Sequence, residues 1–202
     1  FGLGEKTGVE ISEAAGVLAG PASAEKYNKT WQMGDTIQSG IGQSDNLFTP
    51  LQLSNYCATV ANGGKRYELH FVKSIINTAT GSINETGATV AEDLPISDNT
   101  FRIVREGMRM VATDGAPRHV FNKISTPVAC KTGTSQVYKN GQKVNNGFLI
   151  TFAPYDNPEI SIASVIELAG SGTSTADITA SIIDYYYSNN TDEAPAQDTG
   201  TL

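Results

Sequence analysis

The chain has 202 residues, a mass of 21.4 kDa and a formal net charge of -7. This length is sufficient for one substantial hydrophobic core, or for the larger part of a bigger domain. The acidic balance argues against a surface that binds nucleic acid or anionic membranes, because both require clustered lysine and arginine.

The start of the chain gives no targeting signal. Phe1-Gly2-Leu3-Gly4 lacks the basic and hydrophobic regions of a signal peptide. No apolar run in the sequence approaches the roughly 18 residues of a transmembrane helix. We therefore expect any export signal or membrane anchor to lie outside this chain.

Residues 1–40 are rich in glycine, serine and small side chains, and they predict an irregular surface with short helical or strand pieces. A well-marked helix follows. Thr49 is its expected N-cap, Pro50 occupies the first helical position, and Gln52 completes a capping box. Apolar residues then recur at helical spacing until Asn62-Gly63-Gly64, which tolerates the left-handed conformation of a helix end.

Residues 67–76 are short, mixed and β-branched toward their end, and Gly81-Ser82 indicates a turn, so we expect a small strand pair here. A second helix begins after Ser97 or Asp98, either of which can act as its cap. Its apolar residues fall at helical spacing, and Asp114-Gly115 marks its end.

A β-hairpin is predicted in the last third of the chain. Residues 127–134 form its first strand, Asn140-Gly141 its turn, and residues 147–153 its second strand. Residues 159–168 form a third strand that is apolar on both faces. A strand of this kind indicates a sheet that helices cover on both sides.

The last predicted helix opens near Ser174 and Asp177. We expect its buried stripe to consist of Ile178, Ile182, Ile183 and Tyr186. Residues 189–202 are polar and contain proline, so they predict a disordered tail.

The first strand of the hairpin ends in a cation, a glycine and two hydroxyl residues, in the order Lys131-Thr132-Gly133-Thr134. Successive side chains of a strand alternate between faces, so Lys131 and Gly133 share one face, and Thr132 and Thr134 the other. The glycine lets a substrate backbone lie flat against the strand. A cation and several hydroxyls beside the space left by the glycine are suited to bind an acyl compound that carries a carboxylate.

The cysteines and histidines, which often act as metal ligands or catalytic groups, are spread widely along the sequence. The cysteines, Cys57 and Cys130, form no C-x-x-C pair, and neither His70 nor His119 has ligand-like spacing, so no metal site is readable. Cys130 is expected to be a small packed thiol. A disulfide is an open alternative that no pattern supports. Without a histidine near the candidate strand, chemistry there depends on lysine and hydroxyls.

Several short matches to catalytic motifs have simpler explanations. Lys6-Thr7-Gly8 repeats the triplet without an apolar strand before it, and Glu5 replaces the glycine that a phosphate-binding loop requires. Ser23-Ala24-Glu25-Lys26 matches S-x-x-K but lacks an apolar stripe, which favours a surface loop. Ser44-Asp45-Asn46 and Ser97-Asp98-Asn99 both match S-D-N, and we interpret them as a turn and a helix cap.

The wider pattern resembles the transpeptidase domain of class B penicillin-binding proteins over most of residues 1–188. The segments that carry the resemblance occur in the family's order: Phe1-Gly2-Leu3-Gly4-Glu5-Lys6-Thr7-Gly8, Gly40-Ile41-Gly42-Gln43, Thr49-Pro50-Leu51-Gln52-Leu53, Ala61-Asn62-Gly63-Gly64, Lys131-Thr132-Gly133-Thr134-Ser135-Gln136, Phe148, Phe152-Ala153-Pro154 and Val165-Ile166-Glu167. The resemblance implies an α/β (α+β) fold of the β-lactamase and transpeptidase type, with an antiparallel sheet flanked by helices on both faces. Residues 1–188 would be only the C-terminal portion of that domain.

The resemblance also implies roles for the strand residues. Lys131 would hold the carboxylate of the substrate or β-lactam and help to keep the hydroxyl shuttle correctly charged. Thr132 would hydrogen-bond that carboxylate, and Gly133 would keep the floor of the cleft clear. Thr134 would contribute its backbone N–H to the oxyanion hole. In the family the nucleophilic serine lies upstream of the segment that matches Phe1, so we expect this chain alone to be inactive.

The implied function is that of a D,D-transpeptidase, which cross-links peptidoglycan stem peptides through an acyl-serine intermediate and is acylated by β-lactams. No cofactor or metal is implied. The implied partners are stem peptides, β-lactams, the upstream part of the same domain and a membrane glycan polymerase, at the extracytoplasmic face of the bacterial membrane. Two alternatives stay open: a β-lactam sensor or noncatalytic binding domain, and a serine β-lactamase, which needs a deacylating base.

Overall fold

The computed structural model describes residues 1–189, and residues 190–202, which make up nearly all of the expected disordered tail, lie outside that range. The helices are α1 (Pro21–Lys26), α2 (Met33–Gly40), α3 (Pro50–Ala61), α4 (Asp98–Asp114), α5 (Arg118–Phe121), the 3-10 turn η1 (Gly172–Thr175) and α6 (Ala176–Asn189). The strands are β1 (Lys65–Tyr67), β2 (Ser74–Ile76), β3 (Ile83–Glu85), β4 (Val90–Asp93), β5 (Ala129–Lys139), β6 (Gln142–Ala153) and β7 (Ile160–Ile166). Within residues 1–189, no helix combines the length and the apolarity needed to cross a bilayer.

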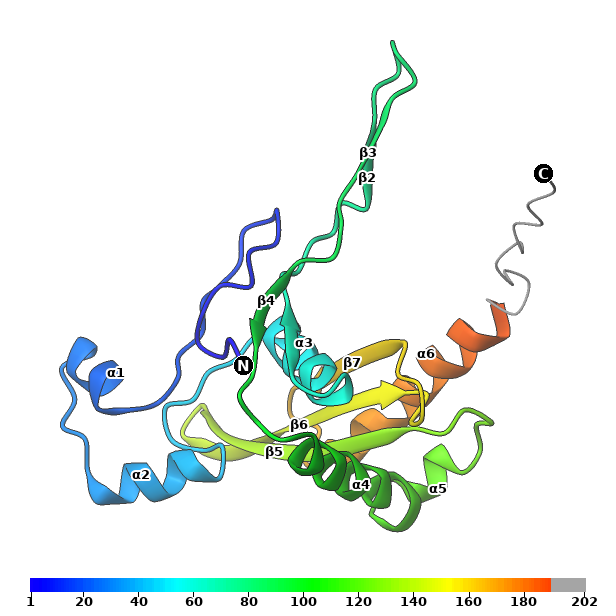
Figure 1. Ribbon diagram of the computed structural model, residues 1–202. Coiled ribbons are helices and arrows are strands. Elements are labelled where there is room, and N and C mark those ends of the chain that lie inside the picture. The colour runs from blue at the N-terminus through cyan, green and yellow to red at the C-terminus, as the bar shows by residue number, and fades with distance from the viewer. Residues whose placement is uncertain (190–202) are drawn as a thin grey trace.

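The centre of the fold is an antiparallel sheet in the order β5-β6-β7 (Figure 1). Asn140 and Gly141 join β5 to β6 with positive φ angles of 53° and 76°, as a tight hairpin turn requires. The predicted hairpin is confirmed, and β5 continues beyond the expected strand to Lys139. The third predicted strand is confirmed as β7.

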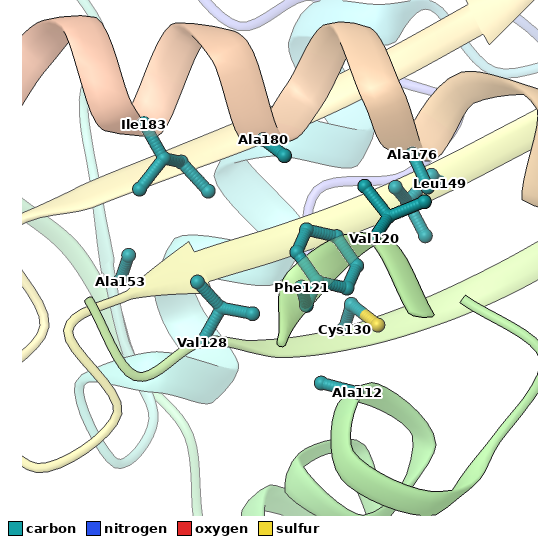
Figure 2. Packing of buried hydrophobic residues seen from close by; sticks show 10 residues of the cluster. All are labelled: Ala112, Val120, Phe121, Val128, Cys130, Leu149, Ala153, Ala176, Ala180 and Ile183. Carbon is teal, nitrogen blue, oxygen red and sulfur yellow. The ribbon is translucent and has the colours of Figure 1, made fainter. Parts of the chain in front are cut away.

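Helices pack on both faces of this sheet, as the apolar third strand predicts. On one face α3 and α4 bury Cys57, Val60, Ala61 and Met108 against Ala129 and Phe152. On the other face, α5 and α6 pack on residues that include Val128, Cys130 and Leu149 (Figure 2). Neighbouring residues of β5 therefore contribute to two separate hydrophobic clusters, because their side chains alternate between faces.

The capping box of α3 is confirmed by reciprocal hydrogen bonds. The Gln52 N–H donates to the Thr49 hydroxyl at 3.2 Å, and the Thr49 N–H donates to Gln52 Oε1 at 3.0 Å. The Gln52 side chain is also buried, and its Nε2 donates to the carbonyls of Ala15, at 2.8 Å, and Glu5. This one glutamine thus attaches the N-terminal segment to the helix that covers the sheet.

The expected buried stripe of α6 is wrong in three of its four members. Ile178 is 53% exposed, Ile182 46% and Tyr186 36%, whereas Ile183 is fully buried. The face that meets the sheet instead consists of Ala176, Thr179, Ala180 and Ile183. The small side chains of Ala176, Thr179 and Ala180 let the helix lie close to the sheet, and the Thr179 hydroxyl is 2.7 Å from the Ser164 hydroxyl on β7. The prediction of a helix was correct, but most of the residues predicted to face the sheet were not.

The middle of the chain forms two small strand pairs, where the sequence predicted one. β1 pairs with β4, and β2 pairs with β3 in a hairpin that projects from the body of the molecule (Figure 1). The predicted helix that follows is α4. Ser97 is its N-cap and accepts from the Thr100 N–H at 3.2 Å.

Candidate functional site

The predicted site residues lie where β5 leaves the hydrophobic core. Val128, Ala129 and Cys130 are at most 1% exposed, and Lys131 directly after them is exposed. Lys131 lies opposite Ile150, and Gly133 lies opposite Phe148 on β6. The apolar residues anchor the strand, and the polar residues that follow reach its solvent-accessible part.

A hydrogen bond from α4 and burial of its first residues fix the start of β5. Arg109 on α4 donates from Nη1 to the Val128 carbonyl at 2.7 Å. Cys130 is the small packed thiol that the sequence predicts, and both it and Cys57 are free and buried. Burial raises the thiol pKa of each cysteine from 9.0 to about 12, so both are neutral at physiological pH.

The outer edge of β5 pairs with no other strand in the described part of the chain. On this edge, the side-chain amide of Gln43 donates to the Thr134 carbonyl at 2.9 Å, and the Lys131 ammonium donates to the Thr132 carbonyl at 2.6 Å. Neither donor belongs to β6, so these carbonyls face away from that strand. The N–H and C=O of one residue point to the same side of an antiparallel strand. The Thr134 N–H therefore also points toward the open edge.

The register of the hairpin gives the same orientation. Gln136, two positions after Thr134, lies opposite Asn145. Lys139 and Gln142 flank the two-residue turn as a hydrogen-bonded pair, and such pairs alternate along an antiparallel ladder, so Gln136 and Asn145 form a pair without mutual hydrogen bonds. The Asn145 carbonyl accepts from the Gly170 N–H at 3.2 Å. Because residues two apart in a strand point the same way, Thr134 and its partner Gly147 also form a pair without mutual hydrogen bonds. The Thr134 N–H is consequently available to a ligand, whereas the Thr134 carbonyl already accepts one hydrogen bond from Gln43.

A second glycine packs against the strand at Gly133. A Cβ built on Gly172 would lie 2.5 Å from the Gly133 carbonyl oxygen and 2.3 Å from that of Phe148. The turn η1 therefore lies directly on the β5–β6 backbone and leaves no room for a side chain. The motifs in the sequence do not point to Gly172, although the two glycines between β7 and α6, Gly170 and Gly172, are a signal of close backbone approach.

The other motif matches have structural roles, as expected. Glu13 accepts from the Thr7 hydroxyl and the Gly8 N–H, each at 2.8 Å. Asn46 donates to the Gln43 carbonyl within its own loop at 3.0 Å, and Ser97 caps α4.

One of these expectations needs correction. The segment with Ser23 forms the short helix α1 instead of a surface loop. The Ser23 hydroxyl contacts the backbone of Gly20, and Lys26 is exposed beside Tyr27. The Pro21 at the first helical position explains the helix, because proline favours that position.

Two cavities lie away from the open edge of β5. A cavity of about 420 Å³ on α6 is lined by Asp177, Ile178, Ser181, Ile182 and Tyr185. A cavity of about 370 Å³ lies where α4 meets the loop after β6, with Arg102, Arg105 and Tyr155 among its lining residues. Neither cavity is lined by Lys131, Thr132, Gly133 or Thr134. The candidate site is therefore an exposed strand edge and the surface beside it.

Comparison with known proteins identifies related chains. The peptidoglycan D,D-transpeptidase MrdA of Haemophilus influenzae is 32% identical over 209 residues, which cover 92% of this chain and 31% of that protein. Penicillin-binding protein 2A of Bacillus subtilis is 32% identical over 179 residues, which cover 82% of this chain and 24% of that protein. The chain thus spans about a third or less of the length of these relatives.

Solved structures show the same fold. Penicillin-binding protein 2B of Streptococcus pneumoniae superimposes with a TM-score of 0.77 at 28% identity, over 94% of this chain and 31% of that chain. PBP2 of Helicobacter pylori, in its complex with MreC, superimposes with a TM-score of 0.75 at 26% identity, over 93% of this chain and 34% of that chain. The penicillin binding protein transpeptidase domain matches residues 1–184. The resemblance seen in the sequence is therefore confirmed, and the chain belongs to the penicillin-binding protein transpeptidase family.

Proposed function

We propose that this chain supplies the K-T-G strand of a longer peptidoglycan D,D-transpeptidase, which cross-links stem peptides and is acylated by β-lactams. The observation that carries the proposal is the open edge of β5, where Lys131-Thr132-Gly133-Thr134 presents a cation, hydroxyls and the outward-pointing Thr134 N–H together. The relatives that share the domain are named peptidoglycan D,D-transpeptidases. Family membership and edge geometry thus favour the same reaction.

In the proposed reaction, a serine hydroxyl outside this chain attacks the penultimate carbonyl of a stem peptide. An ester bond to the serine forms, the peptide bond breaks, and the leaving amine takes up a proton. An acceptor amine then attacks the ester, which forms the cross-link and restores the serine. A β-lactam follows the first step only, because its opened ring remains attached to the acyl group.

Each residue of the strand contributes differently to this reaction. The Lys131 ammonium attracts the carboxylate of the peptide or β-lactam, and the Thr132 hydroxyl hydrogen-bonds it. Gly133 keeps side-chain atoms out of the path of the ligand. The Thr134 N–H points to the open edge and donates to the developing oxyanion, where one such donor is worth about 3 to 4 kcal/mol of transition-state stabilisation.

Two further surfaces favour completion of the fold by an upstream part of the same domain. The outer edge of β7 has no strand partner within residues 1–189, although its side chains are all half-buried. The outer face of α6 exposes Ile178, Ile182 and Tyr185 around a cavity. Unpaired strand edges and exposed apolar faces are normally covered in folded proteins. We expect the residues that contain the nucleophile to be attached to the segment that covers these surfaces.

The structural neighbours also suggest partners and a location for the full-length protein. One structural neighbour was solved with MreC, and another comes from a peptidoglycan synthase complex. We propose that the full-length protein acts at the extracytoplasmic face of the bacterial membrane, anchored outside this chain, with a membrane glycan polymerase as its partner.

Labelling with a fluorescent penicillin tests the proposal. The full-length protein should form a stable covalent adduct, and the 202-residue chain alone should not, because its serine lies elsewhere. In the full-length protein, Lys131→Ala should slow acylation strongly, whereas Lys139→Ala at the exposed far end of β5 should not. Stable labelling of the isolated chain, or near-normal acylation of Lys131→Ala, would refute the corresponding assignment.

Two further assays on the full-length protein, of penicillin hydrolysis and of stem-peptide cross-linking, separate the proposal from its two alternatives. Continuous hydrolysis of penicillin by the full-length protein would indicate a β-lactamase. Stable acylation without any cross-linking of stem peptides would indicate a sensor or a noncatalytic binding domain.

A further inference from the structure

We infer that Gln43 is a positioning residue for acyl transfer, because its side-chain amide restrains the open edge of β5 at Thr134. This inference rests on the function proposed for that edge. It assigns to Gln43 a role that is separate from the K-T-G residues, since Gln43 itself contacts the strand and not the reacting groups.

The contact joins parts of the chain that are distant in sequence. Gln43 Nε2 donates to the Thr134 carbonyl at 2.9 Å, and the two residues are 91 positions apart. Gln43 is half-buried in the loop that follows α2. No strand of the described chain pairs with this edge of β5, so the glutamine provides a restraint on a side that the sheet leaves free.

The backbone of Gln43 is itself held in place. Its N–H donates to the Gln38 carbonyl at 2.9 Å, and its carbonyl accepts from Asn46 Nδ2 at 3.0 Å. Asn46 Oδ1 in turn accepts from the Ala19 N–H at 2.9 Å. Because these hydrogen bonds hold the loop, the side-chain amide of Gln43 reaches the strand at a defined position.

Leu47, the residue after Asn46, ties the loop to the rest of the N-terminal segment. Leu47 forms an antiparallel bridge with Val17 through hydrogen bonds of 2.7 and 2.9 Å. The loop is therefore fastened on the N-terminal side of Gln43 by α2 and on its C-terminal side by this bridge.

The position of this bond explains how it would affect catalysis. The carbonyl that Gln43 holds belongs to the same residue as the proposed oxyanion donor, and both groups point to the open edge. A carbonyl oxygen has two lone pairs, so the bond from Gln43 leaves the second acceptor site for a ligand amide. Catalytic donors act only when they are held close to the productive geometry, and displacements of about 1 Å are costly. Loss of the restraint should consequently slow the chemical step more than it weakens binding.

Acylation kinetics of the full-length protein test this inference. The rate of labelling by a fluorescent penicillin, measured over a range of concentrations, separates the acylation rate constant from the binding constant. Gln43→Ala removes the amide, and Gln43→Met keeps the length of the side chain and adds no charge but removes the N–H donor. Both variants should acylate about fivefold more slowly, the loss of one ordinary hydrogen bond, with binding changed less than about twofold. Gln38→Ala, an exposed glutamine of α2, is the matched control and should acylate like the wild type.

Each other outcome overturns the inference in a recognisable way. A wild-type acylation rate constant in Gln43→Met would show that the N–H donor is dispensable, because this uncharged variant keeps the length of the side chain and lacks the donor. Faster acylation of Gln43→Ala would show that the amide competes with the ligand for the Thr134 carbonyl. A change confined to binding would place Gln43 in ligand recognition. A wild-type protein that penicillin does not label would overturn the proposed function itself, and the inference with it.

Discussion

Gly172 lies against the backbone of Gly133 so closely that any side chain at residue 172 would collide with the K-T-G strand. The nearest atoms to a Cβ at this position are main-chain atoms of Phe148 and Gly133, at 2.3 to 2.9 Å. Main-chain atoms of a paired hairpin cannot move aside as the end of a flexible side chain can. The geometry of β5 therefore depends on a glycine that lies outside the recognisable motif.

Gly172→Ala should destabilise the full-length protein and displace β5. Overpacking of this kind typically costs about 1 to 3 kcal/mol of unfolding free energy. We expect a lower melting temperature together with slower acylation by penicillin. Gly107→Ala on α4 is the control, because a Cβ there meets no atom within 4 Å, and it should stabilise the helix by up to about 1 kcal/mol. An unchanged melting temperature and acylation rate in Gly172→Ala would show that the strand tolerates the displacement.

Local signals account for the parts of the fold that the sequence predicts. The start of α3 follows from a cap, a proline and a capping box within four residues, and the hairpin follows from Asn140-Gly141. Each of these signals acts between neighbours in the chain. They required no knowledge of what packs against the helix or the strand.

The predictions from sequence fail where contacts between distant parts of the chain determine which residues are buried or paired. α6 carries apolar residues on more than one face, and only contact with the sheet determines that Ala180 is buried while Ile182 is exposed. Similarly, the bond from Gln43 to Thr134 and the contact of Gly172 with Gly133 join distant segments. The sequence identified the strand that carries the candidate site, but not the residues that hold it.

Gln52 provides a second prediction, because it does more than cap α3. Its side chain is 1% exposed, and its amide donates to the carbonyls of Glu5 and Ala15. Gln52→Glu replaces that donor with a carboxylate that faces two acceptors. An uncompensated buried charge of this kind costs about 3 to 5 kcal/mol, so the variant should unfold at lower urea concentrations and release residues 5–15 to rapid hydrogen exchange.

The pH dependence of this variant distinguishes charge from packing. Burial beside two carbonyls raises the pKa of a carboxyl at residue 52 above its usual value of about 4.3. Stability should therefore be regained on acidification and lost again as the pH rises through the folded-state pKa. Gln38→Glu at the exposed position of α2 should show neither effect. A loss of stability in Gln52→Glu that is equal at all pH values would indicate a packing defect instead.

The two buried thiols give a third prediction, at alkaline pH. Burial raises the pKa of Cys57 and of Cys130 from 9.0 to about 12 in the folded protein, whereas unfolded thiols ionise near the ordinary value. The folded state thus binds more protons between these two values, so its stability falls as the pH rises through that window. The difference between the wild type and the Cys57→Ala/Cys130→Ala variant isolates the contribution of the thiols to this decline. The alkaline decline in unfolding free energy should be shallower in the double variant, and iodoacetamide at about pH 8 should modify the wild type only after unfolding. Equal declines in both proteins, or rapid modification of the folded thiols, would contradict their burial as neutral groups.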